Sequence, residues 1–295
     1  MNLVGAVVDG ILTGGVYALF AAGLSYMFGV MRLVNLAHGA FAVVAAYLGL
    51  VLSGAFSGLG DPGALLTAAA VTIPVVAAGG YLLQRFVLQS TLSESPLPSL
   101  LVTFGLAIII ENVLLVTMSA DTRKLSLGRG IETASIDLGF TSIGVFPLVI
   151  LLLAVVLLGG LSLVMARTQF GRLVRAVSDD PATVGLTGAD PRHVYAIAAA
   201  IAFGLVAVAG LASGVQTNFS PGSGGMFLIF AFEAVIIGGL GSLWGTLLGA
   251  MILGVVQSVT AVALSPGYKE LVGHLVFLLF LVFLPNGIIR RKVRL

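Results

Sequence analysis

The sequence contains no cysteine, which excludes a disulfide framework and a thiolate metal site. Charge is scarce as well, since Asp, Glu, Lys and Arg make up only 9% of the chain, against roughly 25% in an ordinary soluble domain. The three histidines, His38, His193 and His274, are scattered, so we expect no metal and no other cofactor. The net charge of +2 is too small to indicate a nucleic-acid partner.

Apolar residues instead make up 59% of the 295 residues, and apolar runs recur from end to end. A membrane core of about 30 Å needs about 20 apolar residues per helix. Runs of this kind are 5–28, 33–52, 64–84, 98–119, 143–165, 193–215, 245–264 and 270–289. A further run, 226–240, is short and leads into a Gly-rich stretch. We therefore predict one all-α domain over 1–295, a polytopic transmembrane helix bundle of about nine crossings, one of them short or broken.

The basic residues predict the orientation, because cytoplasmic loops of membrane proteins are enriched in Lys and Arg. If the C-terminal tail is cytoplasmic and all nine runs cross, ten basic residues lie inside and four outside. The inside set is Arg32, Arg85, Arg167, Arg172, Arg175, Arg192, Arg290, Arg291, Lys292 and Arg294, and the outside set is Arg123, Lys124, Arg129 and Lys269. The pattern predicts an external N-terminus and a cytoplasmic C-terminus.

Two polar segments connect the apolar runs. Residues 120–142 form an external loop rich in charge and turn residues, and the sequence leaves its structure open. Residues 166–192 form the longest internal loop, and local signals indicate that it is organised. Arg172, Arg175 and Asp179 are spaced i, i+3, i+7, which places them on one face of a helix.

Proline and capping signals divide this internal loop into two short helices. Pro181 disfavours helical geometry at Asp180, so the first helix should end near Asp179. Asp180 and Pro181 fit the N-cap and first position of a second helix, and Gly188 fits its C-terminal stop. A second Asp-Pro pair, at 190–191, fits the start of the next membrane helix.

Glycine is abundant, at 39 residues, and several glycines are spaced by four. Small residues at this spacing let helix backbones approach closely in lipid. We predict tight helix contacts at Gly10 and Gly14, at Gly210 and Gly214, and at Gly241, Gly245 and Gly249.

Ionisable groups inside spans cost about 2.5–3.5 kcal/mol each, so each needs a physical reason. Glu111, followed by Asn112, lies well inside the run 98–119, and Glu233 lies in the short run. Each carboxylate fits either the lining of a polar pathway or a structural hydrogen bond between helices. Asn35 and His38 are one turn apart at the start of a span, where they fit either a satisfied helix end or a break that faces a cavity.

The sequence does not support an enzyme. Asp9 and His274 lie near the ends of spans and favour structural roles. An intramembrane serine protease needs a serine nucleophile paired with a histidine base, whereas Ser223 lies in an external loop with no evident histidine partner. No Walker A pattern occurs, so any dependence on ATP must come from a partner.

Four segments, in order and covering the chain nearly end to end, resemble the inner-membrane permeases of branched-chain amino-acid ABC importers, the shorter of their two permease types. In GGVYALFAAGLSYMFGVMRLVNLAHGAF, the most telling residues are Asn35, Ala37, His38 and Gly39. FGRLVRAVSDDPATVGLTGADPRHVYAIAAAIAFGLVAVAGLASG is similar to the ATPase-coupling loop and the helix after it. AVIIGGLGSLWGTLLGAMILG and YKELVGHLVFLLFLVFLPNGI resemble the Gly-rich segment and the closing helix, which ends at Pro285, Asn286 and Gly287.

The resemblance implies a bacterial inner-membrane protein, surrounded by lipid, with several partners. These are a paralogous second permease, two cytoplasmic ATPase subunits docked on 166–192, and an extracytoplasmic solute-binding protein. The residues expected in ATPase coupling are Gly171, Arg172, Arg175, Asp179, Asp180 and Gly188. The residues expected to line a pathway at the interface of two permeases are Asn35, His38, Gly39, Glu111, Asn112 and Glu233.

The chain departs from the family pattern in two places. Phe230 stands where the short span is expected to carry a lysine, and Phe86-Val87-Leu88-Gln89 replaces a basic stretch after the third span. The first departure leaves the solute open, because permeases of this type also carry urea and short amides. We expect an ABC permease for branched-chain or related amino acids, with a urea or amide permease as one alternative. The other alternative is an ion-coupled secondary transporter with cation sites at Glu111 and Glu233.

Overall fold

The computed structural model describes residues 3–92, 95–137, 139 and 142–289. Nine helices in this part of the chain are long and apolar enough to cross a membrane, three of them counted with a short 3₁₀ turn in front. They are α1 (Leu3–Met31), α2 (His38–Ala55), α3 (Gly60–Phe86), α4 (Leu97–Met118), α6 (Val145–Arg167), α9 (Pro191–Gln216), α10 (Gly224–Gly238), α11 (Leu243–Ala263) and α12 (Lys269–Phe283). The three turns are η1 (Ser57–Leu59), η3 (Pro221–Ser223) and η4 (Pro266–Tyr268). The predicted all-α transmembrane bundle is confirmed.

The remaining elements are short and lie in the connections. The loop whose structure the sequence left open contains α5 (Arg129–Glu132) and an antiparallel hairpin of β1 (Ser135–Asp137) and β2 (Ser142–Gly144). The 166–192 segment contains α7 (Gln169–Asp179) and α8 (Pro181–Leu186), and η2 (Leu88–Thr91) follows α3. The two short helices predicted before α9 are therefore confirmed.

The structure corrects three of the predicted spans in more than their exact ends. Residues 33–37 are not helical, because α2 begins only at His38. The closing helix ends at Phe283, and the backbone N–H groups of residues 288 and 289 donate at 3.0 Å to the last carbonyls of α10, at Ile237 and Gly238. The short run forms one unbroken helix, so the predicted break falls after it, where Gly239 has a φ of +110°.

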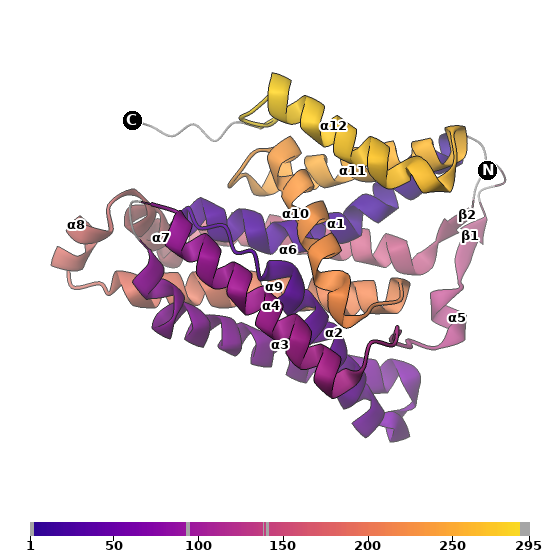
Figure 1. Ribbon diagram of the computed structural model, residues 1–295, viewed down its shortest axis with the longest axis horizontal. Coiled ribbons are helices and arrows are strands. Elements are labelled where there is room, and N and C mark those ends of the chain that lie inside the picture. The colour runs from indigo at the N-terminus through magenta and orange to yellow at the C-terminus, as the bar shows by residue number, and fades with distance from the viewer. Residues whose placement is uncertain (1–2, 93–94, 138, 140–141, 290–295) are drawn as a thin grey trace.

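The elements at the two ends of the bundle differ (Figure 1). The start of α1 lies at the same end as α5 and the hairpin, whereas α7, α8 and the end of α12 lie at the opposite end. This separation agrees with the predicted placement of the charged loops on opposite sides. The C-terminal tail, with Arg290, Arg291, Lys292 and Arg294, lies outside the described residues.

The first four and the last four spans make the same set of pairings. Helix α1 packs on α11 and α10, as α9 packs on α3 and α2. Helix α2 contacts α3 and α4, as α10 contacts α11 and α12. Helices α1 and α9 run in opposite directions through the bundle (Figure 1). The chain is thus built from two halves of inverted orientation.

Most of the predicted glycine contacts occur at these crossings. A Cβ at Gly10 or Gly14 would overlap the backbone of α11, and one at Gly249 would overlap that of α10. A Cβ at Gly210 would overlap the backbone of α2, whereas Gly214 makes room for the side chains of Leu125 and Phe219. Gly241 differs from the prediction, because it lies before α11 in a turn with a φ of +78°.

Candidate transport and coupling sites

Residues 32–37 carry the chain from the end of α1 back to the middle of the bundle without helical structure (Figure 1). Irregular backbone at this depth is tolerated where protein groups or a cavity satisfy its polar atoms. Here the Asn35 side chain accepts from the Ala37 N–H at 3.0 Å, and the Thr103 hydroxyl of α4 accepts from the Leu36 N–H at 3.2 Å. Asn35 is fully buried, and its Nδ2 has no partner among the described residues.

His38 is the first residue of α2, and its side chain lies beside the middle of α1. Its Nε2 lies 2.9 Å from the carbonyl oxygen of Phe20, near the midpoint of that 29-residue helix. The ring fits because Gly23 has no side chain: a Cβ there would lie 2.8 Å from His38 Cε1. The residue is 1% exposed, and its Nδ1 has no partner among the described residues. Asn35 and His38 therefore form one buried polar site with two unused groups.

Two short helices start next to this polar site. A Cβ at Gly39 would overlap the carbonyl oxygen of Gly224, and one at Gly224 would lie 2.9 Å from the backbone nitrogen of Ala40. The first turn of α10 therefore lies directly against the first turn of α2. Phe227 of α10 also stacks on Phe20, with ring centroids 4.6 Å apart. Since each helix N-terminus carries partial positive charge, their junction is electropositive.

Glu111 and Asn112 lie on the exposed face of α4, whose buried side is formed by Ser99, Thr103 and Leu114. Asn112 donates at 2.8 Å to the carbonyl of Ile108 in its own helix. Glu111 lies beside η3, because a Cβ at Gly222 would be 3.3 Å from its Oε1. An exposed carboxylate in a span is costly against lipid, so this face of α4 fits contact with water or protein.

Glu233 lies elsewhere, in contact with the C-terminal helix. Its Oε1 is hydrogen-bonded to Nδ1 of His274 in α12, a contact that becomes an ion pair when the histidine is protonated. The Glu233 side chain is 3% exposed, whereas that of His274 is 41% exposed. A second polar pair, Tyr17 and Gln257, joins α1 to α11 by a 2.6 Å hydrogen bond. These groups were not predicted as a cluster, because they lie far apart in sequence.

The 166–192 segment, the candidate coupling segment, is held by the predicted caps. The Asp180 carboxylate accepts from the N–H groups of Ala182 and Thr183 at 3.0 and 3.1 Å, and Asp190 accepts from the Arg192 N–H at 2.9 Å. The Thr183 hydroxyl holds the pKa of Asp180 below its usual range. Gly188 has a φ of +87°, which suits its predicted place after α8.

Asp190 also links the 166–192 segment to α3. Arg85 donates to it at 2.7 Å, and this bond lowers the pKa of Asp190. One helix turn away from Arg85, the Tyr81 hydroxyl lies 2.8 Å from Nδ1 of His193. The carboxylates of Asp180 and Asp190, which cap α8 and α9, therefore stay ionised over the physiological pH range. The two turns that they stabilise keep their shape over that range.

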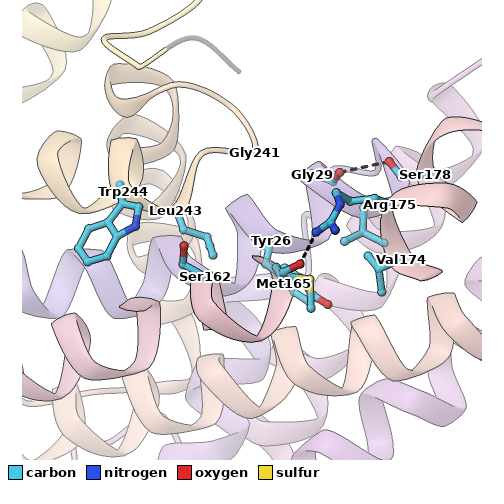
Figure 2. A pocket seen from close by; sticks show the side chains of 11 residues that line it. Tyr26, Gly29, Ser162, Met165, Val174, Arg175, Ser178, Gly241, Leu243 and Trp244 are labelled. Carbon is cyan, nitrogen blue, oxygen red and sulfur yellow. Dashed lines mark hydrogen bonds between the residues drawn. The ribbon is translucent and has the colours of Figure 1, made fainter. Parts of the chain in front are cut away.

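Gly171, Arg172 and Arg175 have different surroundings although all lie on α7. A Cβ at Gly171 would overlap the carbonyl of Met165 at the end of α6, so Gly171 is required within the chain itself. Arg175 donates to the same carbonyl and lines a cavity between α7 and the membrane helices (Figure 2). Arg172 and Asp179 are exposed and free for contact with another protein.

The structure thus brings together Asn35, His38 and Gly39, with Glu111 and Asn112 on the adjoining helix and Glu233 in a separate cluster. Sequence reasoning missed Thr103, Tyr17 and Gln257, which are polar residues in spans, and it gave His274 a structural role without its partner. The presence of uncharged polar groups in spans was the only available signal, and it does not identify their partners.

A bundle of this kind, with a capped polar segment at one end and irregular backbone at membrane depth, defines a polytopic membrane transport protein. The chain belongs to the family described as the permease component of branched-chain amino acid transport systems, which matches residues 6–284. It is a multi-pass protein of the bacterial inner membrane and an ABC transporter permease.

Curated relatives align along almost the whole chain. The high-affinity branched-chain amino acid permease BraD of Pseudomonas aeruginosa is 28% identical over 290 residues, which cover 96% of this chain and 94% of the relative. The corresponding LivH of Escherichia coli K12 is 29% identical over 289 residues, with the same coverage. The autoinducer 2 import permease LsrC of Salmonella paratyphi B is 28% identical over 63% of this chain and 55% of its own length. No solved structure matches the chain.

Proposed function

We propose that the chain is one permease of an importer for branched-chain or related amino acids. In this proposal it pairs with a second permease, two ATPase subunits bind its cytoplasmic face, and an external binding protein delivers the solute. The family match over residues 6–284 carries the proposal. The capped α7–α8 segment supports it, because an ATPase can drive transport only by moving a stiff element of the permease.

The exposed face of α4 is the proposed boundary of the pathway. It presents Glu111 and Asn112 beside η3, and η3 leads directly into the junction of α2 and α10. A zwitterionic amino acid has a carboxylate that suits the electropositive junction and an ammonium that suits Glu111. Asn35, His38 and Gly39 are buried at this junction, so they would meet the solute only after α2 and α10 separate. Glu233 lies apart from this junction. It would influence transport either through the effect of its charge on the solute or by holding α12 in place.

The coupling residues are proposed to act in two ways. Arg172 and Asp179 are exposed on α7 and would contact an ATPase subunit directly. Gly171, Arg175, Asp180 and Gly188 would set the shape and stiffness of the segment, since they satisfy or allow contacts within the chain. Replacing Gly171 by a larger residue would disturb the fold itself, so it would not test the docking of an ATPase.

Uptake of labelled leucine tests the function and its energy source. The chain and the transport proteins encoded beside it would be produced in a strain without its own branched-chain amino-acid uptake. We expect uptake that needs this chain, fails when cellular ATP is depleted, and persists when a protonophore is added with ATP maintained. Uptake that follows the proton gradient instead would favour the ion-coupled alternative, and uptake of urea or amides without leucine would favour the other alternative.

A charge reversal on α7 tests the coupling role. Arg172→Glu should leave the amount of chain in the membrane unchanged but lower leucine uptake at least ten-fold and reduce co-purification of the ATPase. Arg32→Glu is the control, because Arg32 is also exposed and directly follows α1 at this end of the bundle, but lies outside the 166–192 segment. Normal uptake by the Arg172 variant would contradict direct contact through this face.

A further inference from the structure

A cavity of about 200 Å³ lies between α7 and the membrane helices (Figure 2). Its walls come from the last turns of α1 and α6, the inner side of α7, and the start of α11. Arg175 and Trp244 line it and are exposed, so the cavity opens to the surface. It is separate from the polar junction of α2 and α10 described above.

The polar groups of the cavity suit an anion. Arg175 uses one guanidinium nitrogen to bind the carbonyl of Met165, and among the described residues its other donors have no partner, so they can bind a ligand. Tyr26 is only 4% exposed, and its hydroxyl has no partner among the described residues. The lining contains no carboxylate, and the structure records no ion pair between Arg175 and nearby Asp179 within the described residues.

The rest of the cavity is apolar and lies at the level expected for lipid headgroups. Val30, Val174 and Leu243 supply apolar walls, and Trp244 has 47% of its surface exposed. The cavity lies where α1 and α6 end, and α6 ends at Arg167, two residues after Met165, which lines the cavity. Tryptophan is enriched at membrane–water interfaces, and basic pockets between membrane helices on the cytoplasmic side bind anionic headgroups.

We infer that this cavity binds one anionic phospholipid, with the phosphate on Arg175 and an acyl chain along Leu243 and Trp244. A free phosphate would find only one guanidinium among largely apolar walls, whereas a lipid satisfies both kinds of surface. The bound lipid would connect α7 to α1 and α11 and so stiffen the coupling segment. The inference depends on the membrane location of the chain and is independent of the transported solute.

The single tryptophan of the chain makes the site directly observable, since Trp244 lines it. The full chain, with any co-purifying subunits, would be placed in nanodiscs of phosphatidylcholine. Phosphatidylglycerol brominated near the headgroup end of its acyl chains would then be titrated in, and quenching of Trp244 fluorescence measured. The Trp244→Phe variant measures the background fluorescence from tryptophans in any other subunit. Brominated phosphatidylcholine, titrated in the same way, measures quenching by non-specific contact.

We expect half-maximal quenching at a mole fraction about five-fold lower for phosphatidylglycerol than for phosphatidylcholine, which corresponds to about 1 kcal/mol for one basic residue. Arg175→Gln should abolish this preference. Arg172→Gln is the matched control, since Arg172 is exposed on the same helix but does not line the cavity, and it should retain the preference.

Three results of these lipid titrations would overturn the inference. They are equal quenching by the two lipids in the natural protein, an unchanged preference in Arg175→Gln, and displacement of phosphatidylglycerol by inorganic phosphate at constant ionic strength. The first and third need no variant, so they decide the question even if Arg175→Gln does not fold. Loss of quenching when the ATPase binds would also overturn it, because the cavity would then hold protein.

Discussion

Glu111 and Glu233 are both carboxylates inside membrane spans, but the structure satisfies them differently. Glu111 is exposed on α4 beside η3, with no ion pair among the described residues. Glu233 is buried and paired with His274, although its Oε2 has no described partner. A buried charge that loses its only partner is left with its full desolvation cost, whereas an exposed charge is not. Substitutions at the two sites should therefore separate transport from stability.

We expect Glu111→Gln to lower leucine uptake several-fold without changing the thermal unfolding midpoint, with Thr117→Val, another exposed polar position of α4, as its control. Glu233→Ala and His274→Ala should each lower the midpoint. The double variant should lose less unfolding free energy than the two single variants lose in sum, with a coupling energy of about 1–2 kcal/mol. Thermal unfolding of the purified variants measures this cycle. Strict additivity would exclude the pair as an anchor of α12, and unchanged uptake in Glu111→Gln would remove Glu111 from the pathway.

The chemistry of single residues was predictable from sequence only where neighbours in the chain decide it. Asp180 and Asp190 were correctly predicted as caps, because each accepts from N–H groups two or three residues ahead. The partner of Glu233 was not predictable, since His274 lies 41 residues away and meets it only through the packing of α12 on α10. The burial of His38 likewise depends on Gly23 in another helix.

At the scale of elements, the junction of α2 and α10 depends on glycine. Gly39→Ala would place a methyl group into the backbone of Gly224, and overpacking of this kind costs about 1–3 kcal/mol. We expect a lower unfolding midpoint and a loss of uptake. Gly54→Ala is the matched control in the same helix, because nothing lies within 4 Å of a Cβ there. It should be neutral or stabilising by up to about 1 kcal/mol, and equal effects of the two variants would contradict a tight junction.

Hydropathy predicted that the spans exist but not where all of them begin. Residues 33–37 are as apolar as a helix requires, yet they are irregular because Asn35 and Thr103 bind their backbone. Similarly, the run ending at 289 continues past the closing helix, whose last residue is Phe283. There the turn at Gly287, with a φ of +70°, brings two N–H groups to the end of α10. Hydrophobicity does not distinguish such segments from helix, because it reports apolar composition and not which groups bind the backbone.

At the scale of the whole molecule, the inverted pairing of the two halves explains why two short helices meet in the centre. Helices α2 and α10 occupy equivalent places, each following a long helix and an irregular connection. Their N-termini converge, and each half contributes one glycine to the contact. The repeat was not evident in the sequence, because helix packing restrains small and apolar character more than residue identity.

The orientation of this inverted bundle in the membrane remains a prediction from its basic residues, and the absence of cysteine makes it testable without background. Thr122 lies in the loop after α4, next to Arg123, which pairs with Phe219 beyond the end of α9. Ala182 lies in α8, and both residues are exposed. A membrane-impermeant maleimide should label Thr122→Cys in intact spheroplasts but label Ala182→Cys only after permeabilisation. Of the nine spans, α6 is the one that lies between these two positions in the chain. Labelling of both variants from the same side would therefore mean that α6 does not cross the membrane. The reverse pattern would place α7 and α8 outside, where no ATPase could reach them, and the coupling proposal would fail with it.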